Sequence, residues 1–291
     1  MDSEAINPTP TDAATTQVAF RFVQKMAVDL DASDDLKLPG FPEVVAKLQK
    51  ALSDEHGSLK QVAVIINSEP ALAARMLQLA NSAAFRQSAE PVGELRTAVA
   101  MLGFNVVRAT ATNFAMAQLQ EQDWLRPLHP ELQKMWRQAI LVAATSYVVA
   151  KHLEAMPADK AMVAGLFHQL GMLYLLTVAY RDDKALLDDP AWPHIQAEWH
   201  PTVTRAILES WGLPEDVTYA TESQDAVLDG QTENLDRLSL VVAAAKFFVY
   251  EPAAADAADS PLNDVKFSGQ SFADLVEQNR SEIKQVLATL S

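Results

Sequence analysis

The chain has 291 residues, of which 49% are hydrophobic and 21% are charged, so it can bury a core and falls outside the composition of disordered proteins. Its 38 acidic and 23 basic residues give a formal net charge of −15. Because phosphate backbones and anionic lipids attract Lys and Arg, this charge predicts no nucleic-acid partner and no membrane partner. Cysteine is absent, which excludes disulfides and thiolate chemistry and favours a cytoplasmic location.

The first half of the chain predicts a small helical lobe after a short lead. Residues 1–35 are expected to form a disordered lead and an N-terminal helix, because the first sixteen are polar and lack the apolar run of a secretory signal. Apolar residues then recur at helical spacing in five short helices over residues 36–122. Ser58 and Gln61 have the spacing of a capping box, and Gly103 suits a left-handed helix end before a helix capped by Asn105.

The second half predicts a further helical lobe over residues 128–250. A long helix begins near Glu131, and an uncharged stretch, 161–179, follows it. That stretch is long enough to raise the question of a membrane span, but His168 and Gln169 at its centre favour a buried core helix. An acidic loop over 182–193 and a helix beginning at Pro201 come next.

The last part of the chain completes an all-α prediction. Residues 235–250 form an Ala- and Val-rich helix, and residues 251–291 are expected to be a linker and one amphipathic C-terminal helix that packs across the core. The expected fold class is therefore all-α, a compact two-lobed helical fold.

Several segments carry a resemblance to a known family. Residues 38–44 (LPGFPEV), 69–83 (EPALAARMLQLANSA) and 98–103 (AVAMLG) resemble the HDOD family, the HD-related output domains of bacterial signalling proteins. Segments 136–138, 164–171 and 211–215 extend the resemblance over residues 36–250. It implies a second lobe that is similar to HD-type metal phosphohydrolases.

The same resemblance indicates which positions would hold a metal. A working HD site uses a His on one helix, an adjacent His-Asp pair on another, and a further Asp downstream. At these positions the chain has Gln138, the pair His168-Gln169, and Lys246, although the last register could slip by one residue. With one strong ligand left, we expect no metal, no cofactor and no catalytic residues. His168 and Gln169 then form a hydrogen-bonded pair in the core, or line a small-molecule pocket.

Other polar residues are weaker candidates. His194 and His200 match no helical spacing of metal ligands, so packing or capping roles are expected. Asn81 and Ser82 either form a recognition surface or complete a helix end, with Asn81 left-handed. Four arginines of the first lobe either gather into a docking patch for an acidic partner or are separately solvated: Arg75, Arg86, Arg96 and Arg108.

The resemblance to the HDOD family therefore implies a non-enzymatic signal-transduction protein that acts through contacts with other signalling proteins. A degenerate HD-type phosphohydrolase or phosphodiesterase acting on a nucleotide, and a sensor of a small metabolite in the vestigial pocket, remain alternatives. Residues 182–236 hold thirteen acidic and two basic residues, whereas residues 37–151 hold twelve basic and nine acidic ones. An acidic partner is therefore expected on the first lobe.

Overall fold

Helices make up most of the structure, a computed structural model that describes residues 21–22, 24–26, 28, 38–54, 58–86, 90–255 and 257–290. Within these ranges the strands form a single two-stranded hairpin. The predicted all-α class is confirmed. The predicted lead over residues 1–16 lies outside the described residues.

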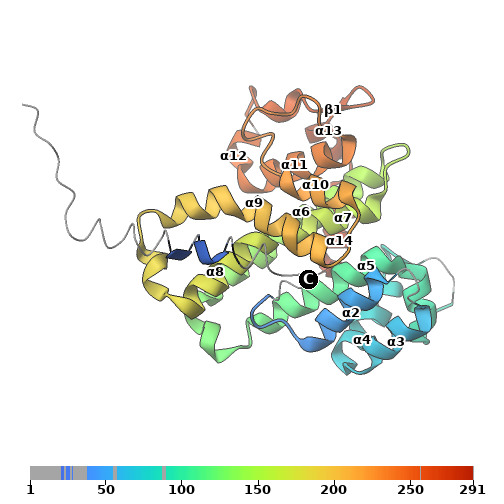
Figure 1. Cartoon of the computed structure of the whole chain (residues 1–291). Helices are drawn as coiled ribbons and strands as arrows, with labels where there is room; N and C mark the ends of the chain where they lie inside the picture. Colours follow the sequence, from blue (N-terminus) through green and yellow to red (C-terminus); the bar gives the residue numbers. More distant parts are fainter. Residues whose placement is uncertain are drawn as a thin grey trace, which may run out of the picture.

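The described part of the first lobe contains four helices (Figure 1): α2 (Glu43–Ser53), α3 (Leu59–Asn67), α4 (Pro70–Ala80) and α5 (Leu95–Leu119). The N-cap half of the predicted capping box is present, since the Ser58 hydroxyl accepts a hydrogen bond of 3.1 Å from the Gln61 backbone amide. Gly103 has φ of +76°, as predicted, and kinks α5 into two segments instead of ending it. One face of each helix is buried in a core that includes Leu48, Ile66 and Leu72.

The second lobe is larger and follows a 3-10 turn at Asp123–Leu128. Its helices are α6 (His129–Lys151), α7 (Ala158–Phe167), α8 (Leu170–Asp182), α9 (Trp192–Ser210), α10 (Glu215–Glu222) and α11 (Arg237–Tyr250), with a 3-10 turn at Lys184–Asp188 before α9. α9 corrects the prediction of a helix beginning at Pro201. Trp192 and Ile195 continue the buried stripe of Val203 and Ile207, so packing carries the helix through the proline.

The C-terminal region is more divided than predicted. It contains α12 (Pro252–Ala255), a 3-10 turn at Pro261–Asn263, strands β1 (Lys266–Phe267) and β2 (Gln270–Ser271), α13 (Phe272–Gln278) and α14 (Arg280–Leu290). The expected single C-terminal helix is thus two helices, with Asn279 between them as the C-cap of α13. α14 returns to the first lobe, where Arg75 donates to the Thr289 carbonyl at 3.1 Å and Asn113 donates to the Leu290 carbonyl at 2.6 Å.

Two glycines allow the central helices to pack closely. Within residues 158–182, 94% of the most apolar 18-residue window is buried inside the protein. The stretch is two helices divided at His168 and Gln169 instead of the one predicted. A Cβ at Gly165 would lie 2.9 Å from Cα of Ala143 in α6, and one at Gly171 would overlap the backbone of α9 at His200. These approaches fix the position of His168 between α7 and α8.

Replacing Gly171 by Ala should therefore destabilise the protein. The added methyl group meets backbone atoms that cannot move independently, so we expect the free energy of unfolding to fall by about 1–3 kcal/mol or more. Urea denaturation measures it, with Gly93→Ala as the control, since a Cβ at Gly93 meets nothing within 4 Å. Equal stability of the two variants would show that α8 and α9 are not packed as described.

Candidate functional site

His168 lies at the centre of the second lobe and is fully buried. Its Nδ1 lies 2.6 Å from the Gly165 carbonyl oxygen, which can only accept, so Nδ1 carries the proton. Nε2 therefore has a free lone pair, and the Tyr250 hydroxyl lies 3.0 Å away and donates to it. Burial lowers the pKa of His168 to about 3, so the imidazole is neutral.

Lys246 lies one helical turn before Tyr250 on α11, and its ammonium is paired with a carboxylate. Nζ of Lys246 lies 2.5 Å from Oδ1 of Asp225, in the segment that follows α10. The Lys246 side chain is only 11% exposed. Burial lowers the pKa of Lys246, but Asp225 opposes that effect. Burial would likewise raise the pKa of Asp225, yet hydrogen bonds and charge from His200 and Lys246 hold it well below its usual value.

His200 is the third buried group around Asp225. It lies on α9, and its Nε2 is 3.5 Å from Oδ2 of Asp225. Burial lowers the pKa of His200, while the hydrogen bond to Asp225 acts in the opposite direction. The predicted packing role of His200 is thus accompanied by a polar contact that the sequence reasoning missed, as it missed Asp225 itself.

The structure brings together only part of the predicted HD positions. His168 and Lys246 share Tyr250, because the Lys246 ammonium lies 5.5 Å from the centre of its ring. Gln169 is buried beside His168, but its Oε1 has no hydrogen-bond partner within the described residues, so the expected hydrogen-bonded pair is not formed. Gln138 is half-buried on α6, and no hydrogen bond joins it to the other three positions in the described ranges.

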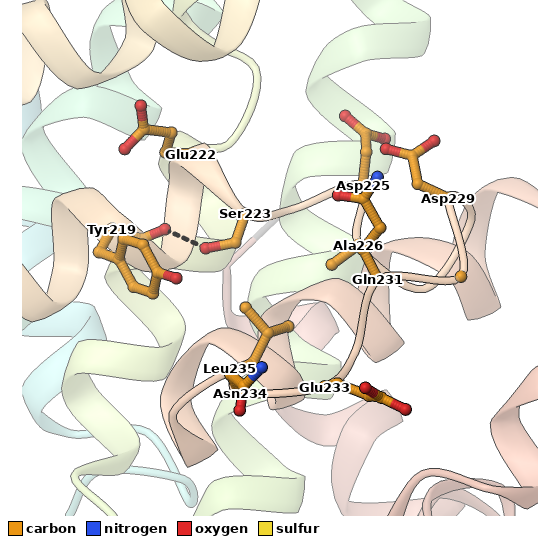
Figure 2. A pocket seen from close by; sticks show the side chains of 11 residues that line it. Tyr219, Glu222, Ser223, Asp225, Ala226, Asp229, Gln231, Glu233, Asn234 and Leu235 are labelled. Carbon is orange, nitrogen blue, oxygen red and sulfur yellow. Dashed lines mark hydrogen bonds between the residues drawn. The ribbon is translucent and has the colours of Figure 1, made fainter.

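A shallow acidic pocket opens beside this cluster, with a volume of about 530 Å³ (Figure 2). Four carboxylates line it: Glu222, Asp225, Asp229 and Glu233. Glu222 is paired with Arg205 at 2.6 Å. Asp225 is paired with Lys246, so Asp229 and Glu233 give the pocket its negative potential, which opposes entry of a phosphate group.

The donor set does not fit a metal ion of the HD type. Among the described residues, no group of three or more His, Asp or Glu side chains is placed to hold one. The lone pair of His168 that would bind the metal is engaged by Tyr250, and a lysine cation stands where a carboxylate would be needed. A dication near Lys246 would meet like charge, so we derive no hydrolytic step from this site.

The predicted arginine patch is corrected at Arg108. This residue is 4% exposed, and its Nη1 donates to the Trp211 carbonyl at 2.7 Å and to Oε1 of Gln49 at 3.2 Å. It therefore joins the two lobes internally and is not part of an exposed surface. Arg75 is half-buried and bonded to α14, whereas Arg86 and Arg96 are exposed.

Asn81 and Ser82 stabilise the loop that follows α4. The Asn81 amide donates to the carbonyls of Leu77 and Val92, both at 2.8 Å, and its oxygen accepts from the Val92 amide at 2.7 Å. Ser82 donates to the Leu79 carbonyl. Asn81 has φ of −91°, so the predicted left-handed conformation is wrong. Its side chain instead holds the entry to α5 beside the end of α4.

The comparisons with known proteins identify the family. The HDOD domain family model matches residues 38–227, more than half of the chain. The chain belongs to the HDOD domain family. An uncharacterised protein of Treponema pallidum (strain Nichols) is 25% identical over 211 residues, which cover 66% of this chain and 38% of that relative's length.

Solved structures share the HDOD fold. A protein of Shewanella amazonensis SB2B, provisionally named a metal-dependent phosphohydrolase, has a TM-score of 0.66 at 21% identity and covers 96% of this chain and 100% of its own. An HDOD domain protein of unknown function from Geobacter sulfurreducens has a TM-score of 0.56 at 16% identity, covering 94% and 98%. At these identities the likeness shows the fold alone.

Removing the Lys246 cation should leave the Asp225 carboxylate without its counter-ion. We expect Lys246→Met to lower the free energy of unfolding by roughly 2–4 kcal/mol, and the double variant Lys246→Met/Asp225→Leu to lose less than the single variant does. Thermal or urea unfolding measures both. Lys160→Met is the matched control, because the Lys160–Asp216 pair is more exposed. A Lys246→Met variant no less stable than the control would contradict the buried ion pair.

The neutral His168 should make stability depend on pH. The unfolded residue gains a proton near its ordinary pKa of 6.5, whereas the folded one does so only near 3, so its contribution is present above pH 6.5 and is lost as the pH falls. Between pH 6.5 and 5 this loss should reach about 1.5–2 kcal/mol. His168→Gln should flatten the profile relative to the control His194→Gln, at an exposed position; parallel profiles would refute the assignment.

Proposed function

We propose that this HDOD chain is a non-enzymatic signal-transduction module that acts through contacts with other proteins. The observation that carries the proposal is the arrangement around His168, where Tyr250 engages the imidazole lone pair and Lys246 neutralises Asp225. A site whose charges and hydrogen bonds are satisfied internally stabilises the fold. It offers no free base and no metal ligand that could activate water to attack a phosphodiester.

The acidic pocket beside the cluster supports the same proposal. A phosphodiester would approach Asp229 and Glu233, while the nearest lysine, Lys246, is already paired with Asp225. Catalysis of phosphoryl transfer relies on positive charge around the phosphate, so the local potential has the wrong sign for hydrolysis. The degenerate phosphohydrolase is therefore the weaker alternative. We also propose that the module is cytoplasmic and works without a bound metal.

The first lobe is proposed as the surface that contacts a partner. Arg86 and Arg96 are exposed near the loop that Asn81 holds in place, and the segment over residues 37–151 carries more basic than acidic residues. The acidic second lobe would repel a partner with an acidic segment, so complementary charge favours docking on the first lobe.

Charge reversal on the first lobe should weaken partner capture. We expect Arg96→Glu to reduce the yield of cross-linked partner from native cell extract several-fold, while Lys134→Glu, an exposed site on α6, retains it. Mass spectrometry of the cross-linked peptides measures the yield and locates the contact. Cross-links confined to residues 182–236 would place the interface on the other lobe.

An assay of the purified protein tests the absence of hydrolysis. We expect no turnover of bis(p-nitrophenyl) phosphate with Mn²⁺ supplied, in the wild type or in His168→Ala. The proposal fails if the purified protein contains a stoichiometric transition metal and turns over the ester, and if His168→Ala abolishes that turnover while His194→Ala does not.

A further inference from the structure

A cavity of about 710 Å³ lies between the two lobes, away from the His168 cluster. The first lobe contributes the segment over residues 38–41 and one side of α2, and the second lobe contributes Arg181, Ser210 and Trp211. Its apolar surface includes Leu38, Phe41 and Trp211, and the rings of Phe41 and Trp211 lie 6.4 Å apart. The volume is in the range of pockets that hold organic molecules of about the size of a drug.

A buried cation lies directly behind the wall of this cavity. Arg108 donates to Trp211 and Gln49, and both of these residues line the cavity. These acceptors are neutral oxygens, and no carboxylate within the described ranges lies within 4.0 Å of the guanidinium. Nε of Arg108 has no hydrogen-bond partner in the same ranges. Burial lowers the pKa of Arg108 to about 10, so the side chain remains charged at neutral pH.

Arg108 lies one residue behind the cavity wall, since its two hydrogen-bond acceptors, Gln49 and Trp211, both line the cavity. A buried ion without a counter-ion is costly, and its field extends further in a protein interior than in water. The cavity also carries the exposed Lys50 at its edge, for which no ion pair is found among the described residues. Glu43, the acidic residue of the lining, is paired with Lys47 at 2.8 Å. The potential inside the cavity is therefore positive.

We propose that this cavity binds an organic anion that carries an aromatic ring. The ring would contact Phe41 and Trp211, and the anionic group would lie toward Lys50, within the field of Arg108. Because the lining comes from both lobes, such a ligand would stabilise one arrangement of the lobes. The site is independent of the proposed partner contacts and of the vestigial metal positions.

The matched probes 1-naphthalenesulfonate and 1-naphthalenesulfonamide test the proposal on the full chain. They have the same ring and differ in charge, so isothermal titration calorimetry should show saturable binding of the sulfonate at one site and at least about fivefold weaker binding of the sulfonamide. Lys50→Gln should weaken the sulfonate about three- to tenfold, whereas Lys60→Gln, an exposed lysine of α3 outside the lining, should not.

Filling the cavity supplies a second variant. Ala46 is exposed and lines the cavity, so Ala46→Trp should abolish binding of the sulfonate while the urea midpoint stays near that of the wild type. Saturable binding that prefers the anion and falls in Lys50→Gln supports the proposal. Absence of saturable binding, equal affinity for the two probes, or an unchanged affinity in Lys50→Gln overturns it.

Discussion

The Lys246–Asp225 ion pair is the contact on which the second lobe depends. It joins α11 to the segment after α10, and His200 of α9 approaches the same carboxylate. Tyr250, one turn further along α11, then reaches His168 between α7 and α8. One pair of opposite charges thus organises side chains from four elements of the lobe. A cation supplied by the chain itself makes this polar core neutral without any ion from solution.

Two cations are buried among the described residues, Lys246 and Arg108, and they have different partners. Lys246 has a carboxylate at 2.5 Å, whereas Arg108 is held by the neutral oxygens of Gln49 and Trp211. The first arrangement is a neutral pair inside the second lobe, and the second leaves positive charge at the boundary between the lobes. Ser53 also donates to the Trp211 carbonyl, so the end of α9 is joined to α2 and α5 by shared hydrogen bonds. Loss of these hydrogen bonds would therefore alter the contacts of both lobes.

The sequence predicts the architecture well and the site only in part. Helical periodicity, the Ser58 N-cap and the positive φ of Gly103 depend on local rules, and the structure contains all three. The continuous α9 was missed because a proline normally begins a helix, and here the buried stripe of Trp192 and Ile195 outweighs that preference. Asp225 could not be found from spacing, since no motif joins it to Lys246 across the 21 residues that separate them. The burial of Arg108 was equally hidden, because an isolated arginine in a sequence gives no sign of what covers it.

A crystal structure of the protein grown with excess Mn²⁺ and analysed by anomalous scattering tests most directly whether the site is closed to metals. We expect no anomalous peak beside Nε2 of His168, with the Tyr250 hydroxyl still donating to that atom and the Lys246 ammonium still on Asp225. A peak within ligand distance of His168, with Tyr250 turned away and Lys246 displaced from Asp225, would show that the site is open to metals.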